Sequence, residues 1–470
     1  MRTPSKPDTG APAPTAAPAA PANDLSISLD HPLPEKGFVN VGKPRPPAPP
    51  FKARPALPDA VLRLPNARVG MPFDQDLVMR DAGADKLVYC EITLPPELGL
   101  TADLRSGTLQ GTPLIAGEYR LAVGYHYASQ SPAEKRLASV TLVVIPDPKS
   151  MWQDLPSDQQ DPYWKPDQAC EAIDGNAFQV IAASKRGRSH AHAGSFRDDD
   201  FRIAQLVQSG WSISVVADGA GSAKFSRRGA ALICERAMRH LQTTLDGAAG
   251  LAIDSAAQAY ATAIADQVAA ATASQERLRQ TLHNSVYLTV GHAAYYALKA
   301  IADECASHAD KTTAIKDYAS TALIAACKRY DFGTLCIAYW VGDGVVAVYS
   351  KSAGVTLLGE VDSGEYSGQT RFLDATEVTQ EALLKRCRFV ITGDLSALVL
   401  MTDGVSDPKF ETEERLAQAV DWDAFWNGIE PVITSGDAEN KLLAWLDFWA
   451  QGNHDDRTIA VIRPLTAAGA

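Results

Sequence analysis

Hydrophobic and polar positions change their pattern several times along the chain, and each pattern predicts a different kind of element. From 57 to 147, short runs of alternating apolar and polar residues are broken by turn residues, which is typical of a small all-β sandwich. From 178 onward, several apolar runs are longer and rich in β-branched residues, as in buried strands. Between about 225 and 308, apolar residues recur every three or four positions in Ala-rich sequence, which predicts long helices.

The part of the chain after 175 therefore consists of strands, then helices, then strands, then helices. This order indicates two sheets with helices packed on their outer faces, an α+β arrangement. We predict strands at 178–184, 201–207, 211–217, 322–329, 334–341, 345–349, 388–392, 397–402 and 458–462. We predict helices at 225–245, at 252–308 with a break near 271–274, at 411–420 and at 438–450.

Composition sets the expected domain boundaries. Residues 1–56 are dominated by Pro, Ala and small polar residues, which bury too little apolar area to offset chain entropy, so we expect a disordered tail. This tail is either a plain tether or a ligand for a module that recognises Pro-rich segments. We expect the β-sandwich at 57–147, a linker at 148–174, the α+β domain at 175–464 and a short disordered end at 465–470.

Charge and cysteine content exclude several classes of protein. The formal net charge is -12, whereas a nucleic-acid-binding protein normally carries a basic face. The seven cysteines include no Cys-x-x-Cys pair, so neither a zinc knuckle nor a disulfide framework is indicated. No apolar run approaches the roughly 18 residues that span a bilayer, and the N-terminus lacks the apolar core of a secretory signal. We therefore expect a cytoplasmic protein with no nucleic-acid or membrane partner.

Acidic residues recur at the ends of the predicted strands. Asp218, Asp343 and Asp403 each follow an apolar run and precede a Gly, while Asp199 and Asp455 lie just before predicted strands. Asp-Gly is a common turn dipeptide, so a single copy says little. Five separated carboxylates in this position match the oxygen ligands that Mg²⁺ and Mn²⁺ prefer. The pattern therefore predicts a site for a hard divalent cation.

The series of motifs resembles the metal-dependent protein phosphatase family, type 2C, in its bacterial form. The resemblance covers about 175–463 and implies an αββα sandwich with a two-metal centre at one end of the sheets. It also implies hydrolysis of phosphoserine and phosphothreonine in a phosphoprotein substrate by a water that two metal ions activate, within a signalling system that includes a partner Ser/Thr kinase. The matching residues are Ser189-His190, Asp198-Asp199, Val-Ala-Asp-Gly-Ala-Gly-Ser at 216–222, Gly229-Ala230, Ser320-Thr321, Val-Gly-Asp-Gly at 341–344, Thr-Asp-Gly-Val-Ser-Asp at 402–407 and Asp-Asp-Arg-Thr at 455–458.

The resemblance also implies roles for single residues. Asp218 would bridge two Mg²⁺ or Mn²⁺ ions, and the carbonyl of Gly219 would complete the shell of one of them. Asp403 and Asp455 would hold the second ion, and Asp199 would hydrogen-bond a metal-bound water. Asp343 matches the position of a weaker third ion. Asp198, Asp200 and Asp456 would be neighbours that support the ligands or are solvated. The match to the family motif leaves open a shift of one residue within 198–200.

Two positions depart from the family pattern. Ala220 stands where eukaryotic members carry a His that can act as a general acid, and Gly194 stands where many members carry a phosphate-binding Arg. Proton transfer could instead come from His190 or His192. Since guanidinium groups match phosphate geometry, Arg186, Arg188 or Arg197 could hold the phosphate. The catalytic candidates are Asp199, Asp218, His190 and Arg197.

Residues 57–147 carry a second resemblance. The segments 94–101, 106–113 and 116–119 resemble the immunoglobulin-like repeat of bacterial cadherin-like proteins, whose members bind or space other modules. The sequence therefore leaves open whether this domain, or the Pro-rich tail, binds a docking partner. Two alternatives to an active phosphatase also remain: a catalytically impaired, metal-binding scaffold of the same family, and a binding module that acts through the immunoglobulin-like domain.

Overall fold

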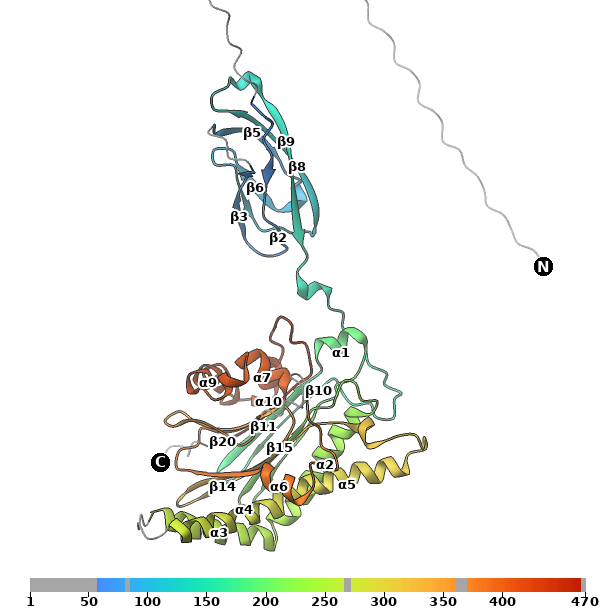
Figure 1. Cartoon of the computed structure of the whole chain (residues 1–470), viewed down its shortest axis with the longest axis vertical. Helices are drawn as coiled ribbons and strands as arrows, with labels where there is room; N and C mark the ends of the chain where they lie inside the picture. The colour runs from blue at the N-terminus through green and yellow to red at the C-terminus, as the bar shows by residue number, and fades with distance from the viewer. Residues whose placement is uncertain (1–56, 81–84, 266–271, 361–369, 466–470) are drawn as a thin grey trace, which may run out of the picture. The chain divides into compact units, whose positions relative to one another are not determined.

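The structure is a computed structural model that describes residues 57–80, 85–265, 272–360 and 370–465 (Figure 1). The tail expected at 1–56 and nearly all of the expected C-terminal end lie outside these residues. Among the described helices, none is both long enough and apolar enough to cross a bilayer.

The described residues before 146 form β-strands joined by turns and short 3₁₀ segments. On β9, Val140, Leu142 and Val144 are buried while the residues between them are exposed, so the alternating pattern places one face of the strand in a core. The sheets have the strand orders β2-β9-β8-β5, β3-β7-β6 and β1-β4. The strands are β1 (Leu62–Arg63), β2 (Ala67–Arg68), β3 (Phe73–Asp76), β4 (Val78–Met79), β5 (Leu87–Thr93), β6 (Leu100–Asp103), β7 (Thr108–Gly111), β8 (Gly117–Tyr127) and β9 (Arg136–Ile145).

Two antiparallel sheets form the centre of the C-terminal part, with the strand orders β10-β11-β20-β19-β16-β17 and β12-β13-β14-β15-β18. A core that includes Val216, Leu323 and Leu400 lies between the two sheets. Because central strands such as β13 and β19 are covered on both faces, they are buried along their whole length and almost continuously apolar. Their bounds are β10 (Gln168–Asp174), β11 (Phe178–Lys185), β12 (Asp200–Leu206), β13 (Trp211–Ala217), β14 (Ala322–Tyr330), β15 (Gly333–Val341), β16 (Val345–Ser350), β17 (Gly354–Leu357), β18 (Cys387–Thr392), β19 (Ala397–Met401) and β20 (Arg457–Pro464).

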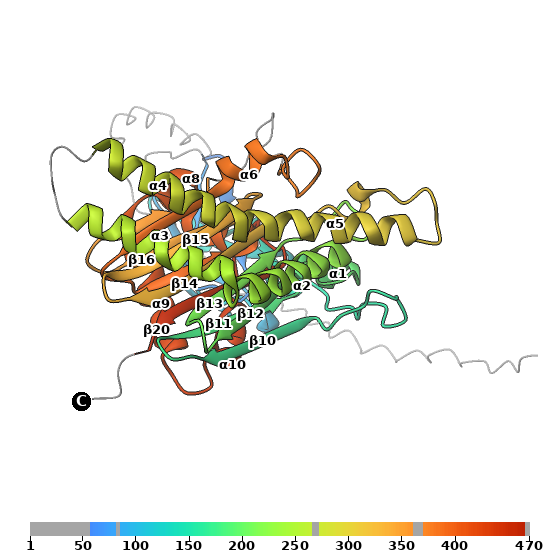
Figure 2. The same ribbon diagram turned by 90° about the horizontal axis from the view of Figure 1, so that it is seen from below.

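Helices cover the outer face of each sheet (Figures 1 and 2). Helices α2 to α5 share a core with the five-stranded sheet, and α7 to α10 share one with the six-stranded sheet. The αββα arrangement predicted for this part of the chain is thus confirmed. The helices are α1 (Arg188–Ala193), α2 (Ser226–Leu245), α3 (Ala248–Ala265), α4 (Thr272–Val286), α5 (His292–Ser307), α6 (Gln380–Arg386), α7 (Asp403–Phe410), α8 (Glu413–Leu416), α9 (Ala419–Ile433) and α10 (Ala438–Trp445), with a π-helical segment (Tyr287–Gly291) between α4 and α5.

Three predictions of local structure need correction. The helix predicted at 411–420 is correct only in part: α8 lies within it, but Glu411 has a φ of 62° and ends α7, and Gln418 is extended before α9 begins. Strand β10 occupies the last residues of the segment expected to be a linker. The sequence analysis also missed α6 and β17. The helix break expected near 271–274 falls partly outside the described residues, since α4 already begins at Thr272.

Candidate metal centre

Three of the predicted carboxylates meet at one end of the two sheets. Asp218 follows β13, Asp343 lies just after β15, and Asp403 begins α7 directly after β19. One carboxylate oxygen from each lies within 4.8 Å of the others. The first two strands belong to one sheet and the third to the other, so the cluster forms where the sheets lie face to face. The spacing of the Asp-Gly dipeptides along the sequence therefore corresponds to a real spatial cluster.

Asp199 comes from the start of the β12 hairpin and is fully buried. Its Oδ2 accepts hydrogen bonds from the hydroxyls of Thr402, at 3.0 Å, and Thr458, at 2.7 Å. Its Oδ1 is buried and has no hydrogen-bond partner among the described residues, and the same is true of Oδ1 of Asp403. Since buried polar atoms are nearly always satisfied, these two oxygens fit the ligand set of a cation or of its bound water.

The acidic groups of this cluster suppress one another's ionisation. Burial, together with the nearby charges of Asp199 and Asp403, raises the pKa of Asp218 well above its usual range. Burial and the charges of Asp343 and Asp455 raise the pKa of Asp403 to about 7. Like charges that share a poorly solvated space need a positive charge to be stable in the ionised form. The donor set and its electrostatics therefore fit one or more divalent cations.

Asp343 has an additional contact that the sequence did not suggest. Oδ2 of its carboxylate accepts a hydrogen bond from the hydroxyl of Thr370. Leu373, three residues further on, donates its backbone N–H to the carbonyl of Ser320 at 2.9 Å. The segment that begins at Thr370 is thus held against the carboxylate cluster.

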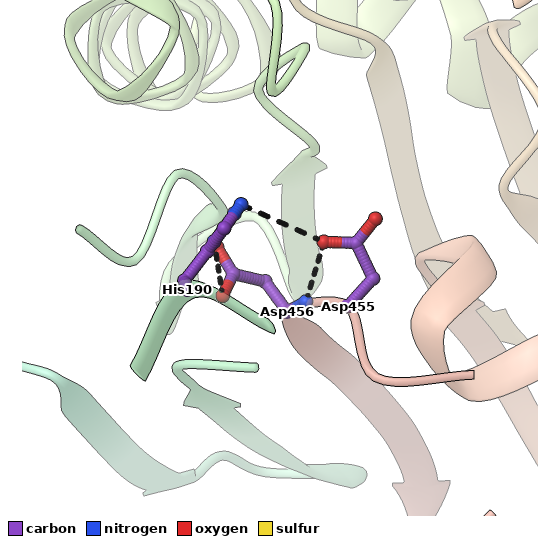
Figure 3. A group of neighbouring side chains, drawn as sticks. All are labelled: His190, Asp455 and Asp456. Atoms are coloured by element: carbon purple, nitrogen blue, oxygen red, sulfur yellow. Dashed lines mark hydrogen bonds and ion pairs between the residues drawn. The ribbon is translucent and has the colours of Figure 1, made fainter. Parts of the chain in front are cut away.

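Asp455, His190 and Asp456 form a second group (Figure 3), and the charge of Asp455 acts on Asp218 and Asp403 of the cluster. Nδ1 of His190 lies 3.0 Å from Oδ1 of Asp456, and its Nε2 lies 4.0 Å from Oδ1 of Asp455. Asp456 is buried, and its carboxylate also accepts backbone N–H bonds from Gly187 at 2.6 Å and from Asp198 at 2.5 Å. Asp456 is therefore a structural acceptor that joins three segments of the chain and is not solvated.

The charge state of His190 follows from this contact. Burial alone lowers the pKa of the imidazole, but the hydrogen bond to Asp456 and the surrounding carboxylates outweigh burial and raise the pKa to about 9. The imidazole is therefore protonated at neutral pH, with Nδ1 held by Asp456. Nε2 lies 3.8 Å from the position that a Cβ on Gly221 would occupy, so it faces the loop that contains Ala220.

The loop after β13 requires small residues. A Cβ on Gly219 would lie 2.9 Å from the carbonyl oxygen of Asp198 and 2.9 Å from the carbonyl carbon of Ser226. Asp198 and Asp200 are both buried, so a solvated role for them is wrong. Asp198 approaches the Gly219 backbone, and burial together with the charge of Asp456 raises its pKa to about 6.

The three arginines considered for phosphate binding all have protein partners. Arg186 pairs with Asp154 at 2.8 Å, and Arg188 pairs with Asp447 at 3.0 Å. Arg197 is buried and donates to three oxygens, namely the hydroxyl of Ser184 and the carbonyls of Asp199 and Pro166. The structure thus uses these side chains to hold the segments around the carboxylates.

A further group was missed altogether by the sequence analysis. Lys165 lies in the segment 152–167, which we call the arm, and its ammonium donates to the carbonyl of Asp199 at 2.6 Å and to that of Asp198 at 3.3 Å. Its Nζ is also 3.5 Å from Oδ2 of Asp200. No local motif marks Lys165, because its partners are backbone atoms more than 30 positions away.

Similarity to known proteins gives the family. A family model described as protein phosphatase 2C matches residues 186–447, whereas no curated protein matches the chain. Solved structures with similar folds include the catalytic domain of the serine/threonine phosphatase PstP in complex with two manganese ions (13% identity, 62% of this chain and 99% of that chain, TM-score 0.35). Others are PppA of Pseudomonas aeruginosa (12%, 63% and 100%, 0.33) and Stp1 of Staphylococcus aureus (12%, 62% and 97%, 0.34). On the family-model match, which spans more than half of its length, this chain belongs to the protein phosphatase 2C family.

Proposed function

We propose that the protein is a metal-dependent phosphatase that hydrolyses phosphoserine and phosphothreonine in protein substrates. The observation that carries this proposal is the cluster of Asp218, Asp343 and Asp403, together with the unpartnered buried oxygens of Asp199 and Asp403. A structural role alone does not explain three crowded carboxylates, of which Asp218 and Asp403 have raised pKa values, because their mutual repulsion costs stability. Metal-dependent hydrolysis, the chemistry of this family, does explain them.

The metal ligands follow from the family motifs and the cluster. Asp218 and the carbonyl of Gly219 would hold one Mg²⁺ or Mn²⁺ ion, and Asp218, Asp403 and Asp455 a second. Asp343 would serve a weaker third ion. When bound, the ions would stabilise negative charge on the phosphate and lower the pKa of a water toward neutrality.

Asp199 and Arg197 would work together on the nucleophile side. Oδ2 of Asp199 is fixed by two threonine hydroxyls, so Oδ1 is the atom free to accept a proton or a hydrogen bond from water. Arg197 donates to the Asp199 carbonyl at 2.7 Å and so holds the backbone that carries this carboxylate. Arg197 would then act on the reaction through Asp199. The phosphate would be bound by the metal ions and not by an arginine side chain.

His190 would supply the proton that Ala220 cannot. Asp456 holds Nδ1 at 3.0 Å and keeps the ring charged, so the proton on Nε2 is available to the oxygen of the departing serine or threonine. Nε2 faces the loop after Asp218, where eukaryotic family members place a histidine. A histidine from α1 would thus replace one from the loop.

The test is a phosphatase assay on a phosphoserine peptide with the full chain. We expect activity with Mn²⁺, none after addition of a chelator, and a loss of at least about 10³-fold in Asp218→Asn. Activity that survives both the chelator and the substitution would refute the proposal. Tight Mn²⁺ binding by the wild-type protein without any turnover would favour the alternative of a catalytically impaired scaffold.

The remaining expectations concern the rest of the chain and its setting. We propose that 57–147 is an immunoglobulin-like domain that docks or spaces a partner; its arrangement of strands in small separate sheets supports this proposal. We further propose that the phosphatase domain, expected at 175–464, begins earlier with β10 and opposes a Ser/Thr kinase in a bacterial cytoplasm. Binding of an isolated partner protein to the full chain, lost on deletion of 57–147, would test the docking role.

A further inference from the structure

Lys165 contacts the backbone of the segment that carries the buried acidic residues 198–200. Its Nζ donates to the carbonyl of Asp199 at 2.6 Å and to that of Asp198 at 3.3 Å, and it pairs with Asp200 at 3.5 Å. The side chain is only 13% exposed, so water cannot readily replace these contacts. One lysine thus binds three consecutive residues next to the metal centre.

The position of Lys165 is fixed by the contacts of the arm. Arg186 donates to the carboxylate of Asp154 at 2.8 Å and to the carbonyl of Leu155 at 2.9 Å. Asp161 forms an ion pair of 2.6 Å with Arg227, which belongs to α2. The arm is therefore bonded to Arg186, just before α1, and to Arg227 in α2, which precede and follow Asp199 in the sequence. The arm itself lies before the residues that the family model matches.

These contacts determine how Asp199 presents its carboxylate. Its carbonyl accepts from both Lys165 and Arg197, and its Oδ2 accepts from two hydroxyls. The backbone carbonyl and one side-chain oxygen are thus held by different donors, and Oδ1 has no partner among the described residues. Removal of Lys165 would leave the Asp198 carbonyl without this donor and let the segment 198–200 shift.

We propose that Lys165 is a positioning residue of the metal centre and that the arm at 152–167 is an integral part of the catalytic unit. Lys165 sets the backbone of Asp198 and Asp199, and this sets the direction of the Asp199 carboxylate and the approach of Asp198 to Gly219. The inference rests on the proposed function, because it takes the carboxylates to be groups that hold metal ions and their waters. It adds a group from outside the family-matched region.

The experiment compares two lysines of similarly low exposure in the full chain. Lys165→Met removes the donor, and Lys328→Met is the matched control, because Lys328 is 15% exposed and binds Asp254 at 2.8 Å on α3, away from the carboxylate cluster. Mn²⁺ affinity is measured by calorimetry on the metal-free proteins. Amide hydrogen exchange of the peptide that covers 197–203 is measured in the absence of metal.

We expect Lys165→Met to weaken Mn²⁺ binding by about 10- to 100-fold, as for groups that orient metal ligands, and to speed exchange at 197–203. Lys328→Met should lower thermal stability but keep Mn²⁺ affinity within about twofold. Wild-type affinity in Lys165→Met, or equal losses in both variants, would overturn the inference. If Lys165→Met does not fold, Lys165→Gln takes its place, since it also removes the charge and the reach to both carbonyls. Absence of Mn²⁺ binding by the wild-type protein would refute the proposed function itself, and the inference with it.

Discussion

The hydroxyl of Thr458 donates a hydrogen bond of 2.7 Å to Oδ2 of Asp199, across 259 positions of sequence. Thr458 is the second residue of β20 in one sheet, and Asp199 immediately precedes β12 in the other. Both side chains are fully buried. This contact joins the two sheets at the metal centre, and together with the hydrogen bond from Thr402 it leaves Oδ1 as the available oxygen of Asp199.

Replacement of Thr458 by Val should remove one of the two hydroxyl donors to Oδ2 of Asp199 with little change in volume. We expect the unfolding free energy to fall by about 1–2 kcal/mol, because a buried acceptor loses one of its donors, and Mn²⁺ affinity to fall at least about threefold. Urea unfolding and calorimetry of the full chain measure the two quantities. An unchanged Mn²⁺ affinity would show that the contact serves stability alone.

The residues of the candidate site that could be predicted from sequence are those that follow a strand. Asp218, Asp343 and Asp403 end apolar runs, and the strand ends of an αββα sandwich meet, so a local pattern contains the spatial cluster. The same holds for most strands of the two sheets, since burial on both faces leaves a continuous apolar run. Helix boundaries after Asp403 were not predictable in this way, because the Asp-Gly dipeptide suggested a turn although it begins α7.

Contacts to the backbone account for what the sequence could not reveal. Lys165 and Arg197 donate to main-chain carbonyls, which every residue possesses, so no residue pattern marks their partners. Asp456 differs from its neighbour Asp455 only by being buried, and an Asp-Asp pair does not tell which of the two is buried. Support for the ligands is thus less visible in the sequence than the ligands themselves.

Crowded carboxylates should make the metal-free protein less stable as the pH rises. Burial and like charges raise the pKa of Asp218 in the folded state, so the folded protein holds its proton more tightly than the unfolded chain. The stabilisation is full below the unfolded pKa near 4 and is lost as the pH rises through the folded value. Between pH 5 and 8 in chelator, we expect Asp218→Asn to lose at least about 1 kcal/mol less stability than the wild type.

Urea unfolding at several pH values measures this difference. Asp303→Asn is the control, because Asp303 lies on α5 and its side chain is 67% exposed, so its curve should follow the wild type. Added Mn²⁺ should restore the stability of the wild-type protein at pH 8 but not that of Asp218→Asn. Parallel wild-type and Asp218→Asn curves would mean that the carboxylates do not repel one another in the folded chain.

A substitution of His190 should separate turnover from metal binding. His190→Gln keeps a polar side chain but cannot donate a proton, so we expect kcat to fall by about 10²-fold while Mn²⁺ affinity stays within about threefold. His192→Gln on the same short helix is the control, because His192 accepts a backbone N–H from Gln153 at 3.1 Å and is exposed. Equal kcat values in the two variants would exclude His190 as the acid.

His240 gives a pH dependence that is independent of the metal centre. Burial lowers the pKa of His240 to about 4, and the nearby His292 adds to the effect. Its ring stacks on Tyr296 with centroids 4.8 Å apart. Because the folded pKa is below the unfolded value of about 6.5, stability is full above pH 6.5 and is lost as the pH falls toward 4. From pH 7.5 to 5, we expect His240→Phe to lose about 1–2 kcal/mol less unfolding free energy than the wild type in chelator; equal losses would contradict the shift.

Two glycines in helices should respond to alanine in opposite directions. A Cβ on Gly229 in α2 would lie 2.0 Å from the carbonyl oxygen of Tyr318 and 2.7 Å from Oγ of Ser320. This hydroxyl donates a hydrogen bond to the carbonyl of Ser226. The backbone cannot make room for this Cβ without a movement of α2, so Gly229→Ala should destabilise the protein by at least about 2 kcal/mol.

A Cβ on Gly428 in α9 meets no atom within 4 Å, so Gly428→Ala should stabilise the chain by about 0.5–1 kcal/mol through helix propensity. Gly229 packs against Ser320, which pairs with Gly219 in an isolated β-bridge. Gly229→Ala should therefore also weaken Mn²⁺ binding, whereas Gly428→Ala should not. Equal effects of the two substitutions on Mn²⁺ affinity would show that the metal centre forms without this close approach of α2 to Ser320.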